Sequence, residues 1–277
     1  MMGTPISKNI STISCWIQSD VDGNTIDESN IQMIVEFIGS TGAGKTTLIS
    51  QIQRRLAQTA NVTTSFDVVA SLPGLHSVNQ PTARNLIQEF VGFPFLICSL
   101  GRHKVFLLFM LRMVARQAAF SIFTLNILRS LARKIGVFEI IKRRQEDRIV
   151  LVDEGTVLLA HNVFVYSGAR YTGEEIATFA SLVPLPDIII YIKAPVEILV
   201  QRALLRPDPP REIRSRNPAL IEKHVNRAVE MFDQLTQAST IQSRLLIVEN
   251  PHSNYQECDD VIERIVKFII NNKSAIG

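Results

Sequence analysis

The sequence has little cysteine. Its 277 residues include only three, Cys15, Cys98 and Cys258, which lie far apart and form no C-x-x-C pair. This odd and scattered set predicts neither a disulfide framework nor a zinc site, and we expect a reducing, cytoplasmic setting. The five histidines show no H-x-x-x-H or H-E-x-x-H spacing, so histidine ligation of a metal is not indicated either.

Long uncharged apolar runs are also missing. The most apolar region, residues 91–131, is interrupted by five basic residues, and its longest uncharged run is the twelve residues 117–128. A membrane-spanning helix needs roughly 20 apolar residues, so we expect no transmembrane segment. The first 31 residues are polar and hold four acids, which is unlike the apolar stretch of a secretion signal.

The overall composition is that of a globular protein. Hydrophobic residues make up 46% and charged residues 20% of the chain, which excludes a disordered or fibrous protein. The net charge of +3 is too small to demand a nucleic-acid partner, and we expect none. We expect a polar N-terminal extension over residues 1–31 and a single folded domain over residues 32–277.

The pattern of apolar runs predicts alternating strands and helices. We expect strands at 33–38, 61–69, 148–152, 187–192 and 245–248, and helices at 45–58, 81–91, 102–134 and 258–271. The stretch 102–134 is long for one connection and could be two helices or an insertion. Continuous apolar strands that alternate with helices indicate a parallel sheet with helices on both faces.

The first functional motif is a complete phosphate-binding loop, or P-loop. Residues 39–46 read GSTGAGKT, which matches G-x-x-x-x-G-K-[ST], and they follow an apolar strand and open a helix. Glycines let backbone N–H groups surround a phosphate, Lys45 adds a positive charge, and Thr46 can bind Mg²⁺. The nucleotide-binding set is Gly39, Ser40, Thr41, Gly42, Ala43, Gly44, Lys45, Thr46 and Thr47.

The second motif is a pair of acids at the end of the apolar strand 148–152. Ligands bind at the carboxyl ends of the strands in open α/β sheets, so Asp153 and Glu154 would reach the site. Asp153 suits a role in holding Mg²⁺ together with Thr46. Glu154 could orient a nucleophile or accept its proton.

The third motif is a cluster of arginines interrupted by prolines. Five arginines fall within residues 202–216, among Pro207, Pro209 and Pro210. A mobile basic lid over residues 202–217 could bring charge to a transferring phosphoryl group, although a solvated basic loop has the same composition. We assign the catalytic roles to Lys45, Asp153, Glu154, Arg202, Arg206 and Arg211.

The three motifs together resemble the P-loop kinases of the thymidylate kinase and deoxynucleoside kinase type, over about residues 32–272. The resemblance implies a three-layer α/β P-loop NTPase fold with a five-stranded parallel sheet in the order 2-3-1-4-5. It implies ATP and Mg²⁺ as cofactors and a small-molecule phosphate acceptor. It also implies that the helical segment 90–147 lies on the acceptor side; from residue 90 to 138 this segment has seven basic residues and no acid, which suits an anionic or aromatic acceptor.

One position departs from that family. Gly155 follows the two acids where the family usually has an arginine that helps bind the acceptor, so the sequence leaves the acceptor open. Asp67 and Glu154 are alternative general bases. Other functions also stay open: a P-loop ATPase or nucleotide-dependent switch, and a membrane-peripheral protein that uses the basic apolar segment. A homodimer is possible.

Overall fold

The protein forms one parallel sheet of five strands. The computed structural model describes residues 32–72, 81–116, 122–144, 146–166, 170–207, 214, 216–250 and 259–276. The strands lie in the order β2-β3-β1-β4-β5 and span β1 (Gln32–Ile38), β2 (Val62–Thr64), β3 (Arg148–Asp153), β4 (Ile188–Lys193) and β5 (Leu245–Glu249). The fold class and the strand order expected from the sequence are confirmed. The expected N-terminal extension, residues 1–31, lies outside the described residues.

Strand β1 occupies the centre of the sheet, between β3 and β4. Phe37 near its carboxyl end lies in register with Asp153, the last residue of β3. Because both strands run in the same direction, the loop after β1 and the acids after β3 meet at one edge of the sheet. This register brings the first two sequence motifs together.

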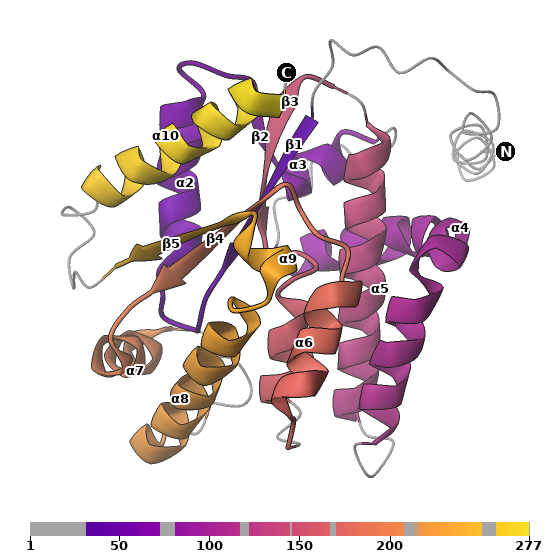
Figure 1. Cartoon of the computed structure of the whole chain (residues 1–277), viewed down its shortest axis with the longest axis vertical. Coiled ribbons are helices and arrows are strands. Elements are labelled where there is room, and N and C mark those ends of the chain that lie inside the picture. Colours follow the sequence, from indigo (N-terminus) through magenta and orange to yellow (C-terminus); the bar gives the residue numbers. More distant parts are fainter. Residues whose placement is uncertain are drawn as a thin grey trace, which may run out of the picture.

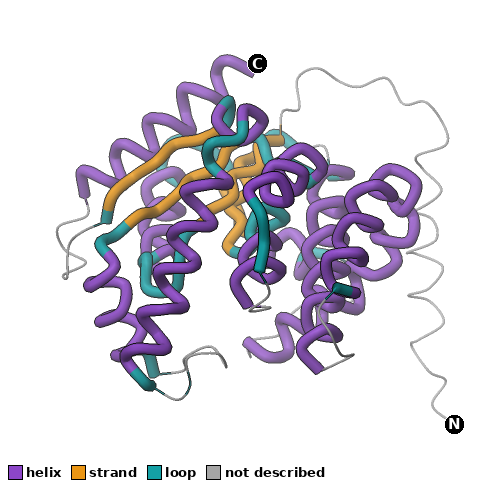
Figure 2. Tube along the Cα trace, turned by 60° about the horizontal axis from the view of Figure 1, so that its bottom comes forward, coloured by secondary structure: helices purple, strands orange, loops and turns teal. Residues whose placement is uncertain are grey.

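Helices cover both faces of the sheet (Figure 1). On one face, α2 (Lys45–Leu56), α7 (Val196–Leu205) and α10 (Asp259–Ile276) pack against Met33, Val35 and Phe37 of β1 and their neighbours. On the other face, α3 (Ser65–Ala70) and α5 (Ile122–Arg143) bury Ile34. Figure 2 shows the orange strands between these two layers of purple helices.

The remaining helices extend the second layer. A π-helical turn, η1 (His161–Tyr166), and the helices α6 (Gly173–Leu182) and α8 (Pro218–Leu235) pack around Phe164, Phe179 and Phe232. A four-residue helix, α9 (Ser239–Gln242), leads into β5. The strand expected at 187–192 and the helix expected at 258–271 are confirmed as β4 and α10.

The strand expected at 61–69 is wrong over most of its length. Only residues 62–64 form a strand, and α3 begins directly after them. The side chain of Thr64 accepts a hydrogen bond from the N–H of Asp67 (3.2 Å), and the Asp67 carboxylate accepts one from the backbone N–H of Thr64 (3.4 Å). This capping box starts a helix in a stretch whose Val and Thr content favours strand.

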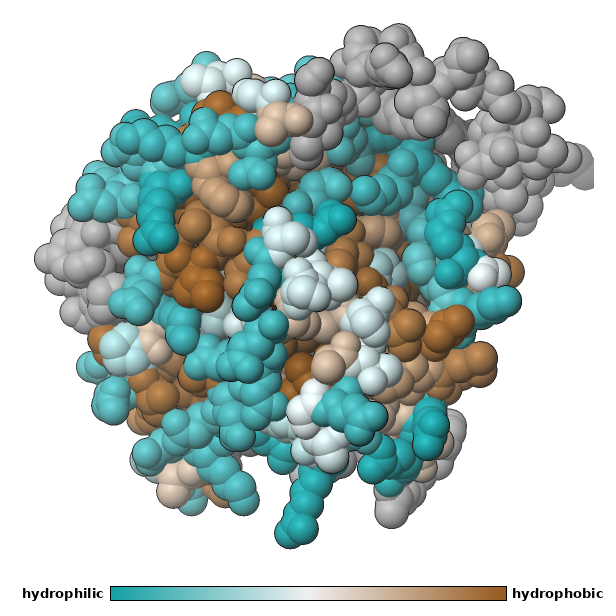
Figure 3. Space-filling model, viewed as in Figure 1, coloured by the Kyte–Doolittle hydropathy of each residue, from teal (hydrophilic) through white to brown (hydrophobic). Residues whose placement is uncertain are grey.

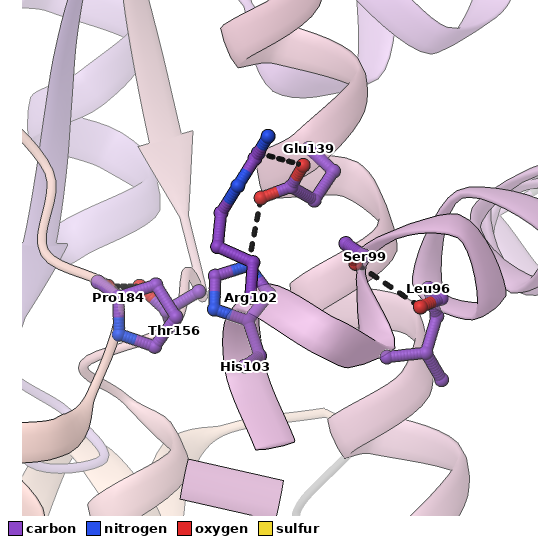
Figure 4. Close-up of polar contacts among 7 residues, drawn as sticks. All are labelled: Leu96, Ser99, Arg102, His103, Glu139, Thr156 and Pro184. Carbon is purple, nitrogen blue, oxygen red and sulfur yellow. Dashed lines mark hydrogen bonds and ion pairs between the residues drawn. The ribbon is translucent and has the colours of Figure 1, made fainter. Parts of the chain in front are cut away.

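Residues 81–143, which include the helices expected at 81–91 and 102–134, form two long helices. The first, α4 (Pro81–Ala115), continues through Pro94, and the second is α5, so the helices expected at 81–91 and 102–134 have wrong boundaries. Gly92 and Gly136 let the two backbones touch, because a Cβ on Gly136 would overlap the backbone of Gly92. The buried carboxylate of Glu139 on α5 bonds Arg102 and His103 of α4 at 2.7 Å each (Figure 4).

Candidate active site

The P-loop between β1 and α2 has the backbone that its glycines predict. Gly42 and Gly44 adopt φ values of 85° and 88°, which L residues with a side chain rarely adopt. A Cβ on Gly42 would lie 2.7 Å from the backbone oxygen of Leu199, so space as well as conformation requires glycine. The loop therefore offers its N–H groups to a phosphate without blocking them with side chains.

Lys45 folds back over this loop. Its Nζ donates hydrogen bonds to the carbonyl oxygens of Gly39 (2.8 Å) and Ser40 (3.1 Å). Burial lowers the pKa of Lys45, and the nearby carboxylates of Asp153 and Glu154 act in the opposite direction. The ammonium group is thus held above the loop, where a phosphate charge would stabilise it further.

Two residues far along the chain brace the loop from outside. Asn250, at the end of β5, donates from Nδ2 to the carbonyl of Ala43 (3.0 Å). Arg202 on α7 donates from Nη1 to the carbonyl of Gly42 (3.0 Å) and from Nη2 to that of Asn250 (3.5 Å). The sequence predicts Arg202 as a catalytic lid residue, but here it supports the P-loop backbone. Asn250 is not among the site residues predicted from the sequence.

Thr46 and Asp153 meet as predicted. The Thr46 hydroxyl donates a hydrogen bond to Oδ2 of Asp153 at 2.8 Å. Burial raises the pKa of Asp153, while Lys45 and the Thr46 hydroxyl favour its charged form. These two hard oxygen ligands fit Mg²⁺, which usually binds one or two protein ligands and completes its shell with water and phosphate oxygens. Among the described residues, no group of three or more His, Cys, Asp or Glu side chains forms a separate metal centre.

Glu154 has an unusual backbone. Its φ of 68° lies in the left-handed region, which costs a non-glycine residue free energy and is over-represented at functional sites. Burial favours its neutral form, but the cations Lys134, Arg133, Lys45 and Arg206 outweigh this effect and lower the pKa of Glu154. The side chain is 57% exposed, so water weakens these interactions. Glu154 is therefore an accessible, ionised carboxylate at neutral pH.

Glu36 is a site residue that the sequence motifs do not include. Its carboxylate is buried in the middle of β1 and accepts hydrogen bonds from the N–H groups of Leu158 (2.9 Å) and Val157 (3.2 Å). A Cβ on Gly155 would overlap this carboxylate, so Gly155 makes room for it. Glu36 thus fixes the turn that follows Asp153 and Glu154.

Keeping an acid at this buried position has a free-energy cost. Burial raises the pKa of Glu36 from 4.5 to about 7, even though the hydrogen bonds from Leu158 and Val157 and the nearby charge of Lys134 favour ionisation. Burial likewise lowers the pKa of Lys134 to about 8. The sequence contains a signal for Glu36: it is the one acid inside the apolar run of residues 33–38.

Two cavities meet at the acid pair. The larger, about 650 Å³, is lined by the P-loop together with Asp153, Glu154 and Arg206. The smaller, about 210 Å³, lies between α5 and the end of β3, and Asp153 and Glu154 line it as well. The rest of its wall combines the cations Arg133 and Lys134, neutral polar residues such as Ser65 and Thr156, and apolar residues such as Val137, Phe138 and Ile141. A cavity at the P-loop and a second cavity that contains two cations therefore share two carboxylates.

The structure places the remaining residues singled out in the sequence at different positions relative to the two cavities. Arg206 ends α7 and lines the larger cavity, as predicted for a residue near the phosphates. Arg211 and the rest of residues 208–213, in the middle of the expected lid, lie outside the described residues. The Asp67 carboxylate caps α3, and this residue is not among those that line the smaller cavity. His161 is buried against Tyr166 and borders the larger cavity.

No family model matches the sequence, and no curated protein matches it. Two solved structures are similar in fold. Shikimate kinase from Acinetobacter baumannii in complex with shikimate has a TM-score of 0.42 and 16% identity, over 88% of this chain and 96% of that one. Shikimate kinase from Bacteroides thetaiotaomicron has a TM-score of 0.44 and 11% identity, over 86% and 98%. Similarity at this level carries no conclusion about the activity of this chain.

Proposed function

We propose that this protein is an ATP- and Mg²⁺-dependent phosphotransferase that acts on a small-molecule acceptor. The observation that carries the proposal is the pair of cavities that share Asp153 and Glu154. A kinase must hold a donor and an acceptor on opposite sides of the transferring phosphoryl group, with charge stabilisation between them. An enzyme that only hydrolyses ATP needs no second cavity at this position.

The larger cavity would hold ATP. The P-loop amides and Lys45 would bind the β- and γ-phosphates, while Arg206 lines the same cavity and can neutralise charge that develops during transfer. Thr46 and Asp153 would hold Mg²⁺, which neutralises phosphate charge when bound. Arg202 and Asn250 keep the loop carbonyls in place, and this bracing preserves the direction of the loop amides.

The smaller cavity would hold the acceptor. Arg133 and Lys134 supply two cations that face the carboxylates of Asp153 and Glu154, with Arg133 3.4 Å from Glu154. Val137, Phe138 and Ile141 give the cavity an apolar wall. An acceptor with one anionic group and an apolar or aromatic body could contact both the cations and the apolar wall. The volume of about 210 Å³ limits the acceptor to a small metabolite rather than a polymer.

Glu154 is the better of the two candidate bases. It lies at the junction of the two cavities and its lowered pKa keeps it ionised, whereas the Asp67 carboxylate is used in a helix cap. An ionised carboxylate at the junction can accept the proton of an acceptor hydroxyl as the new bond to phosphorus forms.

Acceptor-stimulated release of ADP tests the proposal. The full chain, with ATP and Mg²⁺, is screened against nucleosides, nucleotides, sugars, aminoglycosides and small carboxylic acids. We expect one anionic class to stimulate ADP release. Turnover that is substantial without any acceptor, and that no compound stimulates, would favour an ATPase or a nucleotide-dependent switch.

A further inference from the structure

A second surface of the protein has no role in the proposed reaction. The outer side of α4 exposes large apolar side chains at helical spacing, and Phe90 is 79% and Leu108 66% exposed. We define the α4 stripe as these residues: Phe90, Phe93, Ile97, Leu100, Leu108 and Leu111. Lys104 fills the one position between Leu100 and Leu108 that would continue the pattern. In Figure 3, brown side chains gather on the right of the molecule, where Figure 1 places α4.

The opposite side of α4 packs in the hydrophobic core. Phe95, Phe106, Met110 and Met113 are buried against the neighbouring helices, and His103 is held by Glu139. Among the described residues, one segment is long and apolar enough to cross a membrane, Gln88–Ala115 within α4. Because half of this helix packs on the protein, only its outer side is available to an apolar partner, which suits docking at a surface rather than spanning.

The charge around the stripe has one sign. Two acids near the ends of α4 are each paired with a cation: Glu89 with Arg129, and Glu175 with Arg116. Lys104 and Arg112 are exposed and form no ion pair within the described part of the chain. The outer side of α4 therefore combines apolar side chains with unneutralised positive charge.

We propose that the α4 stripe docks on an anionic lipid bilayer. The apolar side chains would enter the boundary between headgroups and acyl chains, while Lys104 and Arg112 contact anionic headgroups. A second copy of the chain fits less well, because pairing two such faces would bring the cations of both copies together without acids to neutralise them. This inference does not depend on the proposed kinase activity.

Co-sedimentation with vesicles tests the inference on the full chain without nucleotide. We expect binding to vesicles with roughly one third phosphatidylglycerol in phosphatidylcholine, and release at high salt. Pure phosphatidylcholine vesicles should bind at least tenfold more weakly. Absence of binding to the anionic vesicles would overturn the proposal.

Variants separate the two contributions. The double variant L100Q/L108Q should lose at least about tenfold in binding, since it removes two of the exposed apolar side chains. The variant K104Q/R112Q should lose about 25-fold, at about fivefold per cation. Leu220→Gln, which changes an exposed leucine on α8, is the matched control and should bind as the wild type does.

Light scattering, which measures the oligomeric state, tests whether a second copy of the chain covers the α4 stripe instead of a bilayer. Monomeric wild-type protein that binds anionic vesicles supports the proposal. If L100Q/L108Q turns a dimer into a monomer and leaves vesicle binding unchanged, the stripe is an interface between copies and the bilayer proposal is wrong. All variants should retain the far-UV circular dichroism of the wild type, because the changed side chains lie in solvent.

Discussion

The two cavities at the acid pair are built in different ways. The phosphate side is made of backbone: the P-loop presents its N–H groups, and its carbonyls are braced by Arg202 and Asn250. The acceptor side is made of side chains, including Arg133 and the buried Lys134 on α5. Backbone recognition suits a phosphate chain of fixed geometry, whereas side chains can be exchanged to suit one acceptor or another.

The difference also concerns stability. The P-loop holds its conformation through glycines and through hydrogen bonds from Arg202 and Asn250 to its carbonyls, and its buried charge, Lys45, lies near the carboxylates of Asp153 and Glu154. Lys134 of the acceptor cavity and Glu36, which fixes the nearby turn after Glu154, are both buried, and burial shifts the pKa of each group in the direction that favours its neutral form. Burying a charged group costs more free energy than hydrogen-bonding neutral backbone groups. Mutation of the buried charged groups should reveal this cost.

The largest expected effect is on the phosphate side. Lys45→Ala should reduce phosphotransfer by about a thousandfold, because the ammonium contributes charge to the transferring phosphoryl group rather than packing. Steady-state kinetics at saturating ATP would measure it. Lys267→Ala, which removes an exposed lysine on α10, is the control and should be fully active. Near-normal turnover of the Lys45 variant would contradict a phosphate-binding role for this loop.

The second effect concerns the buried acid Glu36. Its raised pKa means that the folded state favours the protonated form, so stability is full below pH 4.5 and falls as pH rises through about 7. The shift corresponds to about 3 kcal/mol. The stability of Glu36→Gln relative to the wild type should therefore rise by about that amount across this range.

Urea unfolding at a series of pH values measures this difference. Glu222→Gln, an exposed substitution on α8, is the control and should track the wild type at every pH. If the difference between Glu36→Gln and the wild type did not change with pH, the carboxylate would be ionised without cost, and the contrast between the two sides would disappear.

A smaller effect should separate the two adjacent acids. Glu154→Gln should lower kcat by about a hundredfold and leave ATP affinity unchanged, because it removes a proton acceptor. Asp153→Asn should instead weaken the response to Mg²⁺. Measuring kcat, ATP affinity and Mg²⁺ dependence on both variants tests the division, and equal losses of nucleotide affinity would refute it.

The smallest effect is on acceptor binding. Arg133→Gln should raise the KM for the acceptor about tenfold with little change in the KM for ATP, since Arg133 is among the residues that line the smaller cavity and not among those that line the larger one. Arg129→Gln changes an arginine one turn away on α5 that pairs with Glu89, and it serves as the control. If Arg133→Gln raised only the KM for ATP, the assignment of Arg133 to the acceptor cavity would be wrong.

The same contrast decides what the sequence could predict. The phosphate side follows from nine consecutive residues, and the position of Asp153 follows from the rule that parallel strands end at one edge. The turn after Asp153 and Glu154 depends on contacts between distant segments, such as Glu36 with Val157 and Leu158. The acceptor cavity likewise depends on residues of α5 that meet the end of β3. No local pattern encodes those contacts, and a lone acid in an apolar strand was the only sign.

Where the predicted elements differ from the structure, two features of the sequence favour different conformations, and the structure follows one of them. The Val and Thr content of residues 61–69 favours strand, but the capping box of Thr64 and Asp67 starts a helix after three residues. Pro94 suggests a break, yet α4 passes through it. Arg202 was expected in a lid because of its arginine neighbours; it lies within α7, lines the larger cavity, and donates hydrogen bonds to Gly42 and Asn250, which are 160 and 48 residues away.

The fate of the γ-phosphoryl group tests the central claim most directly. The full chain is incubated for a single turnover with γ-labelled ATP, Mg²⁺ and a mixture of small metabolites, and the labelled products are separated. We predict that the label appears on a small anionic compound, and that Lys45→Ala and Glu154→Gln both abolish or slow its transfer. Label that appears only in inorganic phosphate, at the same rate with and without metabolites, would contradict transfer between the two cavities.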